Sequence, residues 1–247
     1  MSTSVVRAMR VLELLAHAEK PLSLTRIAEA LDIPKSTAHS ILRDLVSESF
    51  VEVGDPPAYS IGLKAFEVGA AHLRVVGAVG VVVPELVRLT SALNITSHYA
   101  VLDHTDAVYL CKHDPPGLGV RLASSVGARL PSHITAVGKA CLAWLDDDRL
   151  ATHVAPASRS PRAVESTLKA LRAELDQVRE QGFATDDEQT SVGIHCVAAP
   201  VFDTTGCRGA IGVSYLEAAV ESLERLTKEV KAAAARASAA LGGQVRR

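Results

Sequence analysis

The chain has no long apolar run, and cysteine is scarce. Its longest apolar stretch, residues 75–83, contains two glycines, whereas a membrane-spanning helix needs about 20 apolar residues. The amino-terminal segment mixes Arg7, Arg10 and Glu13 with apolar residues, which predicts an amphipathic helix and not a signal peptide. The chain has four scattered cysteines and no CxxC pair, at Cys111, Cys141, Cys196 and Cys207. We therefore expect reduced thiols, no metal or other cofactor, no membrane partner and a cytoplasmic location.

Common catalytic motifs are missing as well. The sequence contains no GxSxG nucleophile turn, no GxxxxGK[ST] phosphate loop and no HExxH zinc pair. Two adjacent pairs, Ser132-His133 and His195-Cys196, leave a small-molecule hydrolase as an alternative. Adjacent side chains diverge in extended structure, however, so neither pair is suited to act as nucleophile and base. We predict that the protein is not an enzyme.

Charge and composition indicate neither a nonspecific polycation nor a disordered chain. Lys and Arg number 26 against 28 Asp and Glu, for a net charge of −2 and a pI near 6.5. Hydrophobic residues make up 48% of the chain, and the mean hydropathy is +0.18. A chain of 247 residues with this composition can build a substantial core, in one large domain or two small ones.

Residues 21–61 have the pattern of a winged helix-turn-helix. Apolar residues recur at helical spacing over 24–31 and again over 38–46, and Asp32-Ile33-Pro34 interrupts the pattern between them. Ser23 stands at the N-cap position of the first helix. A short strand, a tip rich in turn residues and a second strand follow over 50–61 and predict a wing.

The predicted second helix, residues 34–47, has a polar face suited to a DNA groove. Hydroxyls and a helix N-terminus can hold phosphates, while longer side chains reach base edges. We predict that His39 and Arg43 read base edges. The full set of predicted DNA contacts is Ser23, Arg26, Lys35, Ser36, Thr37, His39, Ser40 and Arg43. The alternative is a helical hairpin whose polar face is merely solvated. Residues 1–60 carry six Lys and Arg against eight acids, so DNA affinity should depend on a dimer that doubles the contacts.

The rest of the chain divides into a linker helix and a second domain. A heptad-like apolar stripe predicts a linker helix over 63–77 that packs on its own domain or on a partner subunit. We expect Gly77, Gly80 and Pro84 to end this helix. Strands are predicted at 95–102, 107–112, 183–188, 196–203 and 209–216, and helices at 82–93, 136–145, 161–181 and 220–241. We therefore predict an α+β fold with a winged helix-turn-helix domain at 1–62, a linker helix at 63–77 and a largely antiparallel sheet domain at 78–247.

Three stretches together resemble the IclR family of bacterial transcriptional regulators. They are KSTAHSILRDL at 35–45, VGARLPSHITAVGKACLAWL at 126–145 and GFATDDEQTSVGIHCVAAPVFDTTG at 182–206. The resemblance covers nearly the whole chain in the order DNA-binding domain, linker helix, effector-binding domain. It implies a GAF-like effector domain, a homodimer or a dimer of dimers, and a palindromic or nearly palindromic double-stranded DNA operator.

The resemblance also implies an effector pocket over the carboxy-terminal sheet. Members of the family bind small metabolites, often carboxylates or aromatic-pathway intermediates, and N–H groups at the helix that begins at Ala136 would suit an anion. Carried over residue by residue, the pocket residues are Ala136, Val137, Asp186, Ile194, Cys196, Gly212 and Ser214. Some small-carboxylate binders have serine at both of the last two positions. With glycine at the first of them, we expect more space and a ligand larger or less polar than a two-carbon acid.

Structural roles are the alternative for several of these residues. Cys196 would be a small buried hydrophobe, Asp186 would belong to a solvated strand end, and His133 would fix a turn. Strand alternation allows only one of His98 and Tyr99 to face the pocket. We predict a ligand-responsive, sequence-specific DNA-binding regulator of a catabolic operon. A ligand-binding protein without DNA contact is the alternative, and repression and activation both fit the pattern.

Overall fold

The computed structural model describes residues 3–117, 124–154, 161–217 and 222–243. It separates the chain into two compact units, Met1–Val76 and Gly77–Arg247. Each unit has its own buried core.

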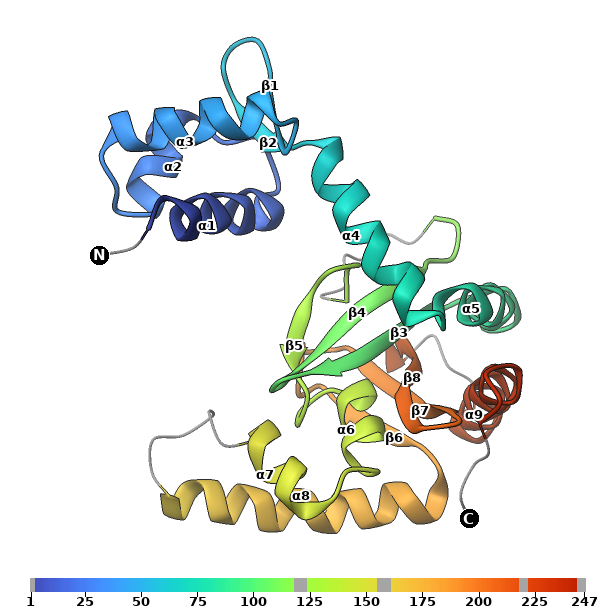
Figure 1. Cartoon of the computed structure of the whole chain (residues 1–247). Coiled ribbons are helices and arrows are strands. Elements are labelled where there is room, and N and C mark those ends of the chain that lie inside the picture. Colours follow the sequence, from blue (N-terminus) through green and yellow to red (C-terminus); the bar gives the residue numbers. More distant parts are fainter. Residues whose placement is uncertain (1–2, 118–123, 155–160, 218–221, 244–247) are drawn as a thin grey trace. The chain divides into compact units, whose positions relative to one another are not determined.

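The amino-terminal unit is a winged helix-turn-helix (Figure 1). Its elements are, in chain order, α1 (Ser4–His17), α2 (Leu24–Ala30), α3 (Lys35–Ser47), β1 (Val51–Val53), β2 (Tyr59–Ile61) and α4 (Leu63–Val76). The first three helices and β1 enclose a core of Val11, Leu15, Ile27, Ile41, Leu42 and Val51. Strands β1 and β2 pair antiparallel, with Val51 opposite Ile61, and form the wing. The predicted fold of this unit is confirmed.

Local sequence explains how α2 begins and how the chain turns into α3. The Ser23 hydroxyl accepts a hydrogen bond from the backbone N–H of Arg26 at 3.4 Å, which is the N-cap that the sequence predicted. Asp32 adopts a left-handed conformation with φ of 50°, which Asp tolerates better than most residues. Pro34 then precedes α3, and no side chain caps this helix. The first backbone N–H groups of α3 are therefore not occupied by a capping side chain.

The carboxy-terminal unit is built on a six-stranded antiparallel sheet with strand order β5-β4-β3-β8-β7-β6. The strands are β3 (Thr96–Asp103), β4 (Asp106–His113), β5 (Arg129–Pro131), β6 (Ala184–Asp187), β7 (His195–Asp203) and β8 (Gly206–Tyr215). The helices are α5 (Val79–Leu93), α6 (Ala136–Leu142), α7 (Asp147–Val154), α8 (Pro161–Gln181) and α9 (Leu223–Ala240). One face of the sheet is covered by α5 and α9, and the other by α6, which α8 covers in turn (Figure 1). The predicted α+β fold is confirmed for this unit too.

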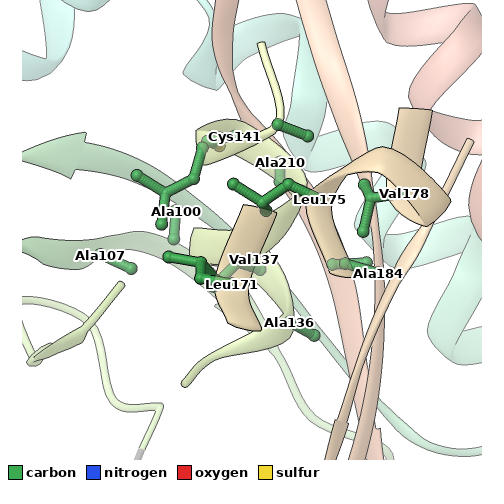
Figure 2. Packing of buried hydrophobic residues seen from close by; sticks show 14 of the residues in the cluster. Ala100, Ala107, Ala136, Val137, Cys141, Leu171, Leu175, Val178, Ala184 and Ala210 are labelled. Carbon is green, nitrogen blue, oxygen red and sulfur yellow. The ribbon is translucent and has the colours of Figure 1, made fainter. Parts of the chain in front are cut away.

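Small side chains let α6 lie close to the sheet. The central strands contribute alanines to this contact, at Ala100, Ala198 and Ala210. Helix α8 adds Leu171, Leu175 and Val178, which Figure 2 shows with Ala100 and Ala210. On another side of α6, Gly138 packs against the turn that precedes the helix, where a Cβ atom would lie 2.1 Å from the backbone oxygen of Ser132. Glycine is therefore required at this point of α6, because any side chain would push the helix away from the preceding turn.

The structure corrects the predicted break after the linker helix. Helix α4 ends at Val76, and Gly77 follows it with φ of 67°. Gly80 and Pro84, which we expected to end a helix, lie inside α5. The proline removes one backbone hydrogen bond. Burial of the apolar face of α5 against the sheet compensates for that loss, because tertiary packing supplies most helix stability in proteins.

Candidate DNA interface and effector cavity

The exposed face of α3 carries most of the predicted DNA-contacting residues. Lys35, His39 and Arg43 recur every four residues and are all exposed, so they form one row along the helix. Ser36 and Ser40 are exposed beside this row, whereas the opposite face of α3 is buried in the core. Cations, an imidazole and hydroxyls on one accessible helix face are the groups that contact phosphates and base edges in DNA.

The remaining predicted contacts lie nearby or have local roles. Arg26 is exposed on α2, Thr37 is half-buried, and Ser23 caps α2. Arg43 donates from Nε and Nη2 to Oδ1 of Asp44, at 3.3 and 3.2 Å. Both side chains are 68% exposed, and an exposed pair of this kind contributes no more than about 1 kcal/mol. The ion pair therefore leaves Arg43 free to exchange Asp44 for another acceptor.

A cavity of about 270 Å³ lies in the carboxy-terminal unit. Strands β3 to β8, the start of α6 and the segment after β6 contribute to its wall. Six of the seven predicted effector residues line it, namely Ala136, Val137, Asp186, Ile194, Cys196 and Ser214. Leu130, Val192 and Leu216 add apolar surface. Stretches that are about 60 residues apart in the sequence, one around 136 and one around 196, thus meet at one cavity.

Asp186 folds the segment that borders this cavity. Its Oδ1 accepts hydrogen bonds from the backbone N–H groups of Gln189 at 2.8 Å and Thr190 at 3.3 Å. Its Oδ2 accepts one from the Thr190 hydroxyl. Asp186 is buried, so the interpretation of this residue as part of a solvated strand end is wrong, although Asp187 and Glu188 are exposed.

Cys196 and Ser214 face each other across β7 and β8. They are register partners, and Sγ lies 3.2 Å from the serine Oγ. Burial raises the pKa of the Cys196 thiol to about 12, and the hydrogen bond with Ser214 only partly opposes this effect. The thiol is therefore protonated at neutral pH and contributes a weakly polar wall, not a nucleophile.

Of the two neighbours on β3, His98 lines the cavity and Tyr99 does not. The Tyr99 hydroxyl donates instead to the backbone oxygen of Arg208 at 3.2 Å. The His98 ring packs edge-on against Tyr109, with 5.1 Å between ring centroids. Burial is the main cause that lowers the pKa of His98 to about 3, and the nearby charge of Lys112 lowers it further. The imidazole is therefore neutral at physiological pH.

The prediction that Gly212 lines the effector pocket and leaves space for a ligand is wrong. Gly212 does not line the cavity, and the space above it is not available to a ligand. A Cβ atom at this position would lie 2.6 Å from Nε2 of His98 and 2.9 Å from Cγ1 of Val137. The glycine makes room for the imidazole, so the absent serine does not imply a larger ligand.

Lys139 supports the cavity, although the sequence did not single it out. It is 1% exposed, and its Nζ donates to Oε1 of Glu174 at 2.6 Å and to Oε1 of Gln189 at 3.3 Å. The backbone N–H of Gln189 is held by Asp186. Lys139 therefore ties α6 and α8 to the segment that borders the cavity.

The two residue pairs considered for catalysis have other partners. The Ser132 hydroxyl donates to the backbone oxygen of Thr105 at 2.8 Å. Nδ1 of His195 lies 2.7 Å from Asp187, whereas Cys196 faces Ser214. Within the described residues, no cluster of His, Cys, Asp or Glu could hold a metal ion. No helix in the described part of the chain is long and apolar enough to span a membrane.

A winged helix-turn-helix joined in one chain to a sheet domain that contains a cavity is the architecture of ligand-sensing transcription factors. Residues 4–54 match the IclR helix-turn-helix domain, and residues 70–239 match the domain described as bacterial transcriptional regulator IclR C-terminal. The chain belongs to the IclR family of bacterial transcriptional regulators. This family consists of DNA-binding regulators and not of enzymes, which also disfavours a ligand-binding protein without DNA contact.

Individual relatives agree with this assignment. The chain is 32% identical over 250 residues to the HTH-type transcriptional regulator KdgR of Escherichia coli (strain K12), covering 97% of this chain and 93% of KdgR. It is 31% identical over 206 residues to the transcriptional repressor IclR of the same organism, covering 81% and 74%. The fold matches an IclR homolog from Microbacterium hydrocarbonoxydans complexed with 4-hydroxybenzoate, with a TM-score of 0.83, 20% identity, and 97% and 99% coverage.

Proposed function

We propose that the protein controls a catabolic operon in response to a small organic metabolite, a carboxylate or an aromatic-pathway intermediate, that binds in the 270 Å³ cavity. The convergence of Ala136, Asp186, Cys196 and Ser214 on one cavity carries this proposal. Ligand pockets generally occupy about 300–1,000 Å³, so this cavity suits a small effector. The Microbacterium homolog is complexed with 4-hydroxybenzoate, an aromatic carboxylate of the proposed class.

Helix α3 is the proposed reading element, acting in the cytoplasm on a double-stranded operator that is palindromic or nearly so. It would enter the major groove, with Ser36, Thr37 and Ser40 on phosphates and with His39 and Arg43 at base edges. Arg26 and Lys35 would contribute phosphate contacts from beside this surface.

A dimer, alone or paired into a tetramer, would place two such helices about one turn of DNA apart. Leu63 and Phe66 of α4 are 64% and 67% exposed. Large apolar side chains that stay exposed on neighbouring turns of a helix favour contact with a partner. Both residues belong to the heptad-like stripe over 63–77, which the sequence predicts to pack either on its own domain or on a partner subunit.

Effector binding can alter DNA affinity only if it favours one arrangement of the regulator over another. Strand β3 offers a route within the carboxy-terminal unit. His98 lines the cavity, and its neighbour Ser97 donates to the backbone oxygen of Leu86 on α5 at 2.8 Å. Only two residues, Gly77 and Ala78, separate the end of α4 from the start of α5. A shift of β3 on ligand binding would therefore act directly on the helix that continues from the linker.

The test is fluorescence anisotropy with labelled DNA from the intergenic region upstream of the protein's own gene, supplemented by selection from randomised DNA. We expect saturable binding that weakens with salt and exceeds binding to a nonspecific control by at least ~10³-fold. Failure to enrich any preferred site from the randomised pool would contradict the proposal.

A further inference from the structure

His98 fits in the middle of the sheet because its neighbours toward β8 and β7 are small, although its register partner on the β4 side is Lys112. Gly212 on β8 is its register partner, and Ala198 on β7 is the partner of Gly212 on the other side. The imidazole occupies the space that a side chain at 212 would take. The result is a polar ring on a cavity wall at a sheet position where packing normally favours an apolar residue.

Two side chains on this cavity wall have polar atoms that nothing in the described part of the chain satisfies. These atoms are Nδ1 of His98 and Oγ of Ser124, and both residues are at least 95% buried. Buried polar groups are nearly always hydrogen-bonded, and each exception calls for an explanation. The coincidence of two such groups on one cavity points to a partner that a bound ligand supplies.

The charges on the wall define which kind of ligand group fits. A neutral imidazole offers one donor and one acceptor, and the low pKa of His98 means that it brings no positive charge. Asp186 is the one charged side chain among the described residues of the wall, and its oxygens are engaged by Gln189 and Thr190. His98 and Ser124 therefore suit an uncharged oxygen, which a hydroxyl or a carbonyl provides.

We propose that His98 determines effector specificity by hydrogen bonding an uncharged hydroxyl or carbonyl group of the ligand, and that Gly212 is the glycine that makes this possible. The inference rests on the proposed function, because it concerns the effector of the same cavity. It deepens that function by adding a second recognition element, distinct from any carboxylate of the ligand. An acid that lacks this oxygen would leave the buried polar atoms of His98 and Ser124 unpaired, and sites of that kind reject such analogues strongly.

The experiment measures the dissociation constants of paired probes by isothermal titration calorimetry at pH 7. The pairs are 4-hydroxybenzoate with benzoate, lactate with propionate, and pyruvate with propionate, so that each pair differs in one hydroxyl or carbonyl oxygen. The proteins are full-length wild type, His98→Leu, His98→Asn and, as a matched control, Tyr99→Phe. The control removes a polar atom from the next residue of β3, whose hydroxyl lies outside the cavity and bonds Arg208.

We expect wild type to bind the oxygenated member of at least one pair about tenfold or more tightly than its partner, as one buried hydrogen bond implies. The preference should fall to within about twofold in His98→Leu, recover in part in His98→Asn, whose amide also donates and accepts, and persist in Tyr99→Phe. A preference that survives in His98→Leu, or a wild type that shows none in any pair, overturns the inference.

Failure of the inference and failure of the proposed function can be told apart. A protein that binds its selected operator but shows no probe preference refutes only the role of His98. A protein that enriches no DNA site refutes the proposed function, while the probe preferences still decide the role of His98.

Discussion

Replacing Gly212 by alanine should destabilise the carboxy-terminal unit by about 1–3 kcal/mol, the usual cost of overpacking a well-filled interior. The added Cβ would lie 2.6 Å from Nε2 of His98, 2.9 Å from Cγ1 of Val137 and 3.2 Å from Cβ of Ala198. Ordinary contacts between heavy atoms are about 3.5–4.0 Å, so the imidazole has to move by close to an ångström. Tyr109 lies against that ring, which limits the movement.

The assay is urea unfolding followed by the fluorescence of Trp144, the single tryptophan of the chain. This residue packs edge-on against Phe202 with 5.0 Å between ring centroids, so it reports on the carboxy-terminal unit. Gly80→Ala is the matched control because nothing lies within 4 Å of the added Cβ. Since Gly80 is inside α5, the control should stabilise the protein by about 0.4–1 kcal/mol.

A double-mutant cycle tests whether the contact with His98 causes the destabilisation by Gly212→Ala. His98→Ala removes the atom nearest to the new Cβ, so adding Gly212→Ala to that background should cost less than it does in wild type. The coupling energy should lie within about 0.5–3 kcal/mol, the range for residues in contact. A tight contact between position 212 and His98 is refuted if Gly212→Ala leaves stability within about 0.5 kcal/mol of wild type, the range of a neutral surface substitution, or if its cost adds to that of His98→Ala without coupling.

Four further predictions follow from individual side chains. Arg43→Ala should cost about 1–3 kcal/mol at one operator position and relax specificity there, and an unchanged sequence preference in a binding-site selection would refute base readout. Lys139→Met should lower the free energy of unfolding by about 1–3 kcal/mol because Gln189 and Glu174 lose a buried donor, which urea unfolding measures. Cys196 should resist iodoacetamide at pH 8 in the folded protein and react after unfolding, because its pKa of about 12 keeps it a thiol, as mass spectrometry of the labelled peptides would show. With a folded pKa of about 3, below the usual 6.5, His98 takes up a proton on unfolding, so wild type should lose about 1.4 kcal/mol per pH unit relative to His98→Gln between about pH 6 and 4. Parallel stability curves for these two proteins would contradict the low pKa.

The parts of the fold that follow local rules could be predicted from the sequence. Apolar spacing placed the helices of the amino-terminal unit, and Ser23 caps α2 as its position indicated. Asp146 caps α7 in the same way, because its Oδ1 accepts a hydrogen bond from the backbone N–H of Arg149 at 2.8 Å. Such features depend on neighbours within four residues, so they can be read directly from the chain.

The cavity residues that escaped prediction depend on distant partners. Lysine in a helix is ordinarily solvated, and Lys139 is buried only because Glu174 and Gln189, 35 and 50 residues further along the chain, reach it. The place of His98 depends on glycine at 212, more than a hundred residues away, and neither residue reveals the other in a single sequence. For the same reason Gly212 was interpreted as space for a ligand, although a residue on the adjacent strand fills that space.

Coupling between effector and DNA is tested most directly by measuring the affinity for the selected operator with and without each acid of the probe panel, by anisotropy at fixed salt. We predict that at least one probe changes the dissociation constant for the operator by about fivefold or more, as typical coupling energies imply. The same probe should bind the cavity with an affinity that His98→Leu reduces. Operator binding that every cavity-bound probe leaves unchanged would contradict the claim that this chain couples effector and DNA.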